Sequence, residues 1–277
     1  MRNASFLFAS LILVLVACGP AARDGGPGGD DDDQPPSGIE ECTNATDDDG
    51  DGRADCSDPD CSGIDGCPVC GAVENPEAQP LALPDGVGTG AMCSTDAQCT
   101  DPTAPNCVAK ECHASYNSQL NFIGFADDAK LLDPSLLLKV CVKMEHSWLR
   151  DLQMELLTPD GAVFILHKFV DRTGGETFLG NANDSDDDDN PIAGTGMDYC
   201  WTPTAASTMM DAATGMLLPA GDYKAVAPWS ALTGTTLNGT WEMRVTDLWG
   251  IDNGFLFSWS IAFDPTLVSD CAGPIIL

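Results

Sequence analysis

An acidic segment near the N-terminus has the residue spacing best suited to holding a metal ion. Carboxylates stand at loop positions 1, 3, 5, 9 and 12 and glycine at position 6, namely Asp47, Asp49, Asp51, Asp55, Asp58 and Gly52. Alternate residues of a tight loop can turn their side chains inward, and the backbone carbonyl of Arg53 at position 7 supplies another oxygen. Since Ca²⁺ takes about six to eight oxygen ligands, the spacing predicts a calcium loop.

The loop departs from the EF-hand pattern at its last position, where Asp58 replaces the longer glutamate, and no helical sequence flanks it. It resembles the DxDxDG calcium repeats of extracellular proteins, above all the aspartate- and cysteine-rich repeats of bacterial surface lipoproteins. The alternative interpretation is a solvated acidic linker whose charges only repel one another.

Other acids stand beside predicted turns further along the chain. Asp151, Asp171, Asp198, Asp247 and Asp252 could hold a structural ion or make local hydrogen bonds to turn amides. A continuous run at 186–189 lacks the alternate spacing of a calcium loop, which favours a solvated loop there.

The overall charge limits the choice of partners. The chain has 277 residues, with 43 Asp and Glu against 12 Lys and Arg, for a formal net charge of -31. Such a surface repels nucleic acid and anionic lipid, and it attracts divalent cations.

The N-terminus has the pattern of a lipoprotein signal. Apolar residues run from Phe6 to Val16 and end in Leu15-Val16-Ala17-Cys18, which resembles a lipobox and predicts acylation of Cys18 after cleavage. Gly19 follows in place of Asp, which by the rule for enteric bacteria predicts the outer membrane or cell surface. An ordinary secretory signal is the alternative, because the run is too short to span a bilayer.

Composition divides the exported chain into short segments and one larger domain. We expect a signal (1–18), a disordered acidic tether (19–38), a Cys-rich calcium module (39–70), a linker (71–90), a second Cys-rich module (91–115), a β-domain (116–266) and a tail (267–277). Thirteen cysteines less Cys18 leave twelve, an even number that predicts disulfides. Position alone suggests that Cys141 pairs with Cys200, and zinc at Cys67 and Cys70 is a disfavoured alternative.

Apolar alternation predicts strands in the larger domain. Every second residue is apolar in Trp241, Met243 and Val245 and again from Phe255 to Ile261, with a turn-rich segment between them that predicts a closing hairpin. Residues 136–142 could begin a helix, but Pro134 and the alternation that follows favour a strand. Many short strands between turn signals predict a β-sandwich.

The β-domain resembles the P domain, or Homo B domain, of subtilisin-like proprotein convertases. The shared elements are His146, Asp151-Leu152, the strand and turn at 156–161, Gly174-Gly175, Asp198, the 238–241 segment, Asp247, Asp252, Gly254 and Trp259. The resemblance covers roughly residues 116–266 and implies a jelly-roll β-sandwich. It also makes Asp151 and Asp198 candidate ligands of an ion within the β-domain, and it suggests a serine protease as a partner.

The sequence lacks the residues that a serine peptidase needs. The chain has three histidines, His113, His146 and His167, and no Gly-x-Ser-x-Gly motif. In Gly194-Thr195-Gly196-Met197, Gly196 stands where subtilisins have their nucleophilic serine. We expect His146 to hydrogen-bond near Asp151 and His167 to be exposed, so a cryptic hydrolase is the least favoured function.

The tryptophans suggest binding. Trp241 and Trp259 lie in the apolar phase of their strands and should be core residues, whereas Trp148 and Trp249 stand in predicted turns, where exposed indoles could stack on sugar rings. We therefore expect a non-catalytic, calcium-dependent binding or assembly module for protein or glycan at the cell envelope, attached to the membrane by its lipid alone. The alternative is an accessory or stabilising subunit of a separate subtilisin-like serine endopeptidase.

Overall fold

The computed structural model describes residues 40–62, 64–67, 70–171, 173–183, 191–268 and 271. Within these ranges the one α-helix is α1 (Met209–Ala212), and short 3-10 turns lie at Asp55–Ser57, Pro59–Cys61, Asp96–Gln98, Pro134–Leu136, Leu149–Asp151, Trp229–Leu232 and Pro265–Leu267. The strands are β1 (Ala72–Ala82), β2 (Gly88–Met92), β3 (Asn106–Val108), β4 (Glu111–His113), β5 (Tyr116–Phe122), β6 (Lys130–Leu131), β7 (Leu137–His146), β8 (Leu152–Leu157), β9 (Val163–His167), β10 (Met197–Trp201), β11 (Gly221–Tyr223), β12 (Thr235–Thr236), β13 (Gly239–Asp247) and β14 (Gly254–Phe263). The predicted all-β fold is confirmed.

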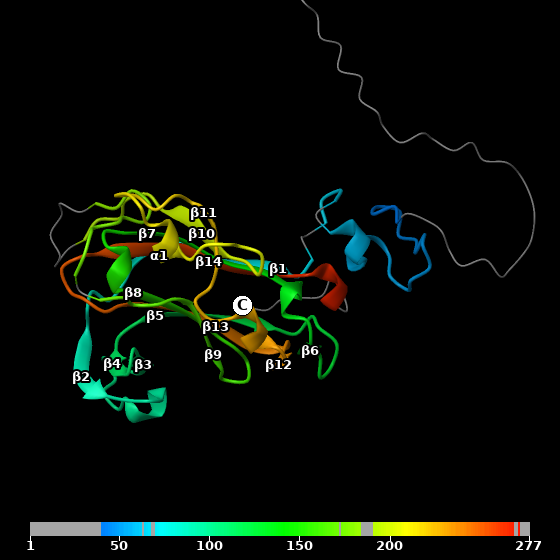
Figure 1. Cartoon of the computed structure of the whole chain (residues 1–277). Helices are drawn as coiled ribbons and strands as arrows, with labels where there is room; N and C mark the ends of the chain where they lie inside the picture. Colours follow the sequence, from blue (N-terminus) through cyan, green and yellow to red (C-terminus); the bar gives the residue numbers. More distant parts are fainter. Residues whose placement is uncertain are drawn as a thin grey trace, which may run out of the picture. The chain divides into compact units, whose positions relative to one another are not determined.

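Eight strands form two antiparallel sheets, visible as two layers in Figure 1. One sheet has the order β1-β14-β7-β10, and the other has the order β5-β13-β8-β9. If these eight strands are counted along the chain, the orders are 1-8-3-6 and 2-7-4-5, which is the strand order of a jelly roll. β11 extends the first sheet by pairing in parallel with β10.

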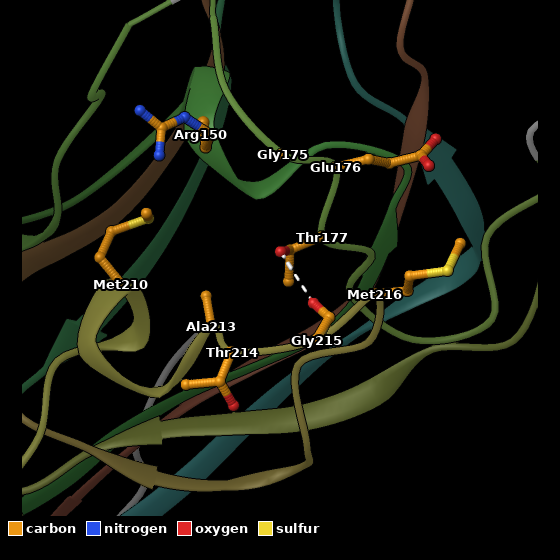
Figure 2. A pocket seen from close by; sticks show the side chains of 9 residues that line it. All are labelled: Arg150, Gly175, Glu176, Thr177, Met210, Ala213, Thr214, Gly215 and Met216. Carbon is orange, nitrogen blue, oxygen red and sulfur yellow. Dashed lines mark hydrogen bonds between the residues drawn. The ribbon is translucent and has the colours of Figure 1, made fainter.

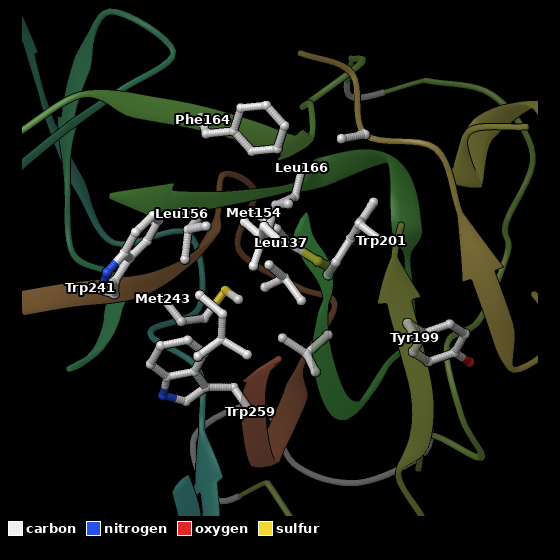
Figure 3. Packing of buried hydrophobic residues seen from close by; sticks show 14 of the residues in the cluster. Leu137, Met154, Leu156, Phe164, Leu166, Tyr199, Trp201, Trp241, Met243 and Trp259 are labelled. Carbon is white, nitrogen blue, oxygen red and sulfur yellow. The ribbon is translucent and has the colours of Figure 1, made fainter. Parts of the chain in front are cut away.

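The core lies between the two sheets. Trp241 of β13 and Phe122 of β5 each contact Phe263 of β14 in the opposite sheet, with 5.4 Å between ring centroids. Figure 3 shows Trp241, Met243 and Trp259 among the aliphatic side chains, and all three are fully buried. Because burial of large aromatic side chains is the main favourable term in folding, these residues hold the sheets together.

The predicted closing hairpin is wrong in its pairing. β13 pairs with β5 and β8, whereas β14 pairs with β1 and β7 in the other sheet. The six residues between them, 248–253, therefore form an arch from one sheet to the other. Alternation marks both strands correctly, but it is the same for strands that pair side by side and for strands that face each other across a core.

The predicted linker at 71–90 is also wrong, because β1 is an edge strand of the sandwich. It pairs with β14 despite containing Pro76 and Pro80. A strand at a sheet edge needs hydrogen bonds on one side only, so it tolerates proline. The sandwich thus begins at residue 72, and the smaller sheet β2-β4-β3 is inserted between its first two long strands.

Six disulfides join the twelve cysteines that the structure describes. Cys42–Cys61 and Cys56–Cys67 close the first module, Cys93–Cys107 and Cys99–Cys112 close the second, and Cys70–Cys271 joins the two ends of the sandwich. Cys141 of β7 and Cys200 of β10 lie opposite each other and are also bonded.

Several sequence-based expectations fall outside the described residues. They are the signal with Cys18, the tether at 19–38, the acidic run at 186–189 and most of the tail. Among the residues that are described, no helix has the length and apolar character needed to cross a membrane.

Candidate functional site

The acidic loop gathers its carboxylates into two groups that share Asp49. One group contains Glu40, Asp47 and Asp49, and the other contains Asp49, Asp51 and Asp58; in each, one ligand atom per residue lies within 4.8 Å of the others. The loop is wound tightly by its own backbone, because the amides of Gly50 and Gly52 donate to the two carboxylate oxygens of Asp47 at 2.6 and 3.0 Å. A loop of this form turns carboxylate oxygens toward one centre.

Asp58 is the most buried acid of this loop, with 1% of its surface exposed. Its Oδ1 accepts from the amide of Asp60 at 2.6 Å, but its Oδ2 has no hydrogen-bond partner among the described residues. Burial raises the pKa of the Asp58 carboxyl, and the neighbouring Asp51 and Asp49 raise it further. Buried oxygens are normally satisfied, so the Oδ2 of Asp58 is a candidate metal ligand.

Two members of the site differ from the sequence prediction. Asp55 lies outside both carboxylate groups, because its Oδ1 accepts from the amide of Ala45 at 3.0 Å. Glu40 takes a place in the site, is 6% exposed, and accepts from the amides of Asp48 and Asp55 at 2.9 and 2.8 Å. Glu40 precedes the loop pattern, and the Cys42–Cys61 disulfide two residues later fixes the chain beside it. The amide of Arg53 donates to Asp51 at 2.9 Å.

A second polar cluster lies where two arches join the sheets at one end of the sandwich. Residues 147–151 connect β7 to β8, and residues 248–253 connect β13 to β14. The amide of Ser147 donates to the carbonyl of Asn253 at 3.1 Å, and the amide of Leu248 donates to the carbonyl of Asp151 at 3.1 Å. The two arches are therefore held side by side by their backbones.

His146 and two aspartates form the buried centre of this cluster. The Nδ1 of His146 accepts from the amide of Trp148 at 3.0 Å, and its Nε2 lies 3.3 Å from the Oδ2 of Asp247. Burial lowers the pKa of His146, but the carboxylate of Asp247, together with those of Asp151 and Glu145, outweighs this effect and raises the pKa to about 9, so Nε2 carries a proton that it donates to Asp247. Asp151 is 2% exposed, and burial raises the pKa of its carboxyl to about 8.

The structure does not bring Asp198 to Asp151, although both were candidate ligands of one ion. Asp198 is exposed on β10, lies opposite Lys143, and lines a different hollow that also contains Glu74. The alternation of a strand puts successive side chains on opposite faces, and Asp198 is on the outer face. Sequence order gives no sign of this separation.

The two tryptophans expected in turns are half-buried and lie around Asp151. Trp148 and Trp249 line a small cavity of about 20 Å³ together with Asp151, Asp171 and Asp252. Part of each of these two residues stays exposed, and their role in binding stays a prediction. Trp241 and Trp259 are core residues, as the sequence predicts.

His167 is buried, which corrects the expectation that it is exposed. Its Nε2 donates to the carbonyl of Leu149 at 3.0 Å, and its side chain lies 1% exposed on β9. Burial lowers the pKa of His167 to about 4, so the imidazole is neutral at physiological pH. Through this hydrogen bond to the backbone of Leu149, His167 holds the arch that leads to Asp151.

A larger hollow of about 300 Å³ opens beside the first arch. Figure 2 shows Arg150 and Met210 on one side of it and Glu176 and Met216 on the other, with Thr177 between them. The Oγ1 of Thr177 donates to the carbonyl of Gly215 at 3.1 Å, which links the two loops that form its floor. Met216 is 67% exposed. Charges of both signs beside adaptable methionine side chains suit a polypeptide partner.

Comparison with known proteins gives limited information. No protein-family model matches the chain, and no curated protein matches it. The solved structures that are similar to part of it include a complex of a serine protease of Aeromonas sobria with a chaperone (15% identity, TM-score 0.28) and a serine protease of Aeromonas sobria (15% identity, TM-score 0.26). They match 71% and 72% of this chain, which spans only 27% and 28% of theirs.

Proposed function

We propose that this chain is a non-catalytic binding or assembly module of the cell envelope, anchored through acylated Cys18 and dependent on Ca²⁺. The observation that carries the proposal is the hollow between Arg150, Met210, Glu176 and Met216. Exposed methionine beside charged groups is a feature of protein-binding surfaces, because the unbranched thioether adapts to different partners. The β-domain, which resembles a P domain, would be the scaffold that presents this hollow.

Calcium fits the residues of the acidic loop. Glu40, Asp47, Asp49, Asp51 and Asp58 would hold it, since their oxygens gather in two overlapping groups. The buried Oδ2 of Asp58 has no hydrogen-bond partner in the described part of the chain, and a cation would supply one. Bound Ca²⁺ would neutralise the repulsion among these acids. The two disulfides of the module fix the loop on either side.

Two of the three histidines, His146 and His167, make structural hydrogen bonds. Both ring nitrogens of His146 have partners, Asp247 and the amide of Trp148, and the Nε2 of His167 is bonded to a backbone carbonyl. A general base needs a ring nitrogen within reach of a nucleophilic hydroxyl or thiol. These two residues instead position the arches.

The second candidate function is that of an accessory or stabilising subunit of a separate serine endopeptidase. It is favoured by the resemblance of residues 116–266 to the P domain, which in convertases packs on a catalytic domain. The same hollow would then receive a segment of the protease.

Capture from an envelope extract and from a panel of polysaccharides tests both functions. We expect the acylation-free mature chain to retain a protein or glycan in Ca²⁺ and to release it in chelator. Stoichiometric recovery of a serine protease, identified by mass spectrometry, would define an accessory subunit. Recovery of a glycan or of other surface proteins would define an adhesive module.

Two methionine variants test whether the retained partner binds at the hollow. Met216→Asp should abolish retention, because it places a charge at the rim of the hollow. Met92→Asp should leave retention intact, because Met92 is as exposed, at 70%, but lies on β2 of the small sheet. Equal retention by both variants, or none by the native chain, contradicts the proposed surface.

A further inference from the structure

We propose that Asp151, Asp247 and Asp252 form a second Ca²⁺ site, which clamps together the two arches at one end of the sandwich. This site is separate from the acidic loop and does not include Asp198. Asp151 belongs to the arch between β7 and β8, whereas Asp247 ends β13 and Asp252 lies in the arch between β13 and β14. An ion among them would link both crossovers between the sheets.

The first argument is that the carboxylate of Asp151 lacks a partner. Neither of its oxygens has a hydrogen-bond partner among the residues described, although the side chain is 2% exposed. The nearest positive candidate is the Nδ1 of His146 at 3.9 Å, and this nitrogen already accepts from the amide of Trp148. Burial disfavours the ionised form of this carboxylate, and a bound cation would supply the opposite charge that stabilises it.

The second argument is that the space beside Asp151 has the size of one ion. The cavity of about 20 Å³ is lined by Asp151, Asp171 and Asp252 together with Trp148 and Trp249. A cavity of this volume accommodates roughly one water molecule or one bare cation. The Asp171 carboxylate is already paired with the guanidinium of Arg150 at 2.9 Å, whereas neither carboxylate oxygen of Asp151 has a hydrogen-bond partner among the described residues.

The third argument concerns which cation fits. The ligand atoms of Asp151 and Asp247 lie within 4.8 Å of each other and of His146. Both nitrogens of His146 are committed, so His146 is a positioning residue that holds Asp247 through its Nε2. The remaining donors are carboxylate oxygens, which are the ligands of a hard cation. Irregular arches tolerate the flexible geometry of Ca²⁺ better than the strict octahedron of Mg²⁺.

Terbium luminescence offers a direct test, because Tb³⁺ replaces Ca²⁺ at oxygen sites and emits when a nearby indole is excited. Trp148 and Trp249 line the cavity, whereas the calcium module at 40–70 contains no tryptophan. We therefore expect strong indole-sensitised emission from the full chain carrying Asp49→Asn and Asp58→Asn, which disable the loop. Added Ca²⁺ should displace the emission. Absence of sensitised emission in this background overturns the second site.

Two aspartate variants in the same background locate the ion. Asp151→Asn should abolish the emission and the rise in melting temperature that Ca²⁺ produces, because ligand binding to the folded state stabilises it. Asp198→Asn, on the outer face of β10, should keep both. If Asp151→Asn fails to fold, Asp252→Asn in the half-buried arch provides the same loss. Emission that survives Asp151→Asn or Asp252→Asn in a folded chain contradicts the proposal.

Discussion

The buried side chain of His167 makes the stability of the folded protein depend on pH. His167 is neutral inside the sandwich and supports the 3-10 turn at Leu149–Asp151 through its bond to Leu149. Its pKa is lowered by burial to about 4 in the folded state, whereas an unfolded chain has a histidine pKa of about 6.5. Between these values the unfolded chain takes up a proton that the folded chain does not, so stability falls as the pH falls.

His167→Gln should remove this part of the acid sensitivity, because glutamine retains an N–H donor for the carbonyl of Leu149 and does not titrate. From about pH 7 to about pH 5, we expect the native chain to lose about 2 kcal/mol more of its unfolding free energy than the variant does. Urea unfolding at the two pH values measures the difference. Parallel losses in both proteins would show that His167 titrates normally.

At the scale of strands, hydrogen bonds across the sandwich fix the edge strand β1. Ser118 of β5 accepts from the side-chain amide of Asn75 on β1 at 2.7 Å and from the indole Nε1 of Trp259 on β14 at 2.9 Å. Tyr116, also on β5, donates to Glu77 of β1. A strand that carries two prolines is thus held by its neighbour β14 and by the opposite sheet.

Ser118→Ala should destabilise the sandwich by about 1–3 kcal/mol, because the buried indole N–H of Trp259 would lose its acceptor. Ser260→Ala is the matched control on the outer face of the same region, where a change within about 0.5 kcal/mol is expected. Denaturant unfolding compares the two. A cost at Ser118 no larger than that at Ser260 would show that the bond across the sandwich contributes nothing.

The positions of the strands were easier to predict from sequence than the pairing of one strand with another. Alternation locates β13 and β14 through Trp241 and Trp259, since each strand buries one face. Pairing depends on contacts distant in sequence, so the arch between them looks like a hairpin turn. Pro76 and Pro80 conceal β1 for a related reason, because its position at an edge is a property of the whole sheet.

The candidate sites differ in the same way, because residues that are close in sequence are predictable and residues brought together by the fold are not. The loop acids Asp47, Asp49, Asp51 and Asp58 are recognisable because their spacing is local. Glu40 is brought to them by the fold of the module, outside any spacing rule. In the β-domain, Asp151 stays a predicted ligand, and the acids that the structure places beside it come from an arch about a hundred residues away, which only long-range strand order can bring close.

At the scale of the whole molecule, disulfides and charge act against each other. A formal net charge of -31 opposes compaction, while six disulfides restrict the unfolded chain. The Cys70–Cys271 bond closes the longest loop, with a sequence separation of 201 residues. It joins Cys70, two residues before β1, to the segment after β14, and β1 and β14 are adjacent strands in one sheet.

Replacing both Cys70 and Cys271 by serine should therefore cost more stability than replacing Cys93 and Cys107. The chain-entropy relation gives about 5 kcal/mol for the longer loop and about 3 kcal/mol for the shorter one, whose separation is 14 residues. Urea unfolding of the two double variants under non-reducing conditions measures the order. The opposite order would mean that the small sheet, and not the sandwich, depends most on its covalent bonds.

The bond between Cys70 and Cys271 also changes what a single proteolytic cut can do. Cleavage of one peptide bond anywhere between these two residues leaves both pieces covalently joined, because each piece keeps one of the two sulfurs. Strand pairing on both sides of the cut would then hold the nicked sheets in register. A molecule cut once in this range would release no fragment, and its cleavage would become visible only after reduction.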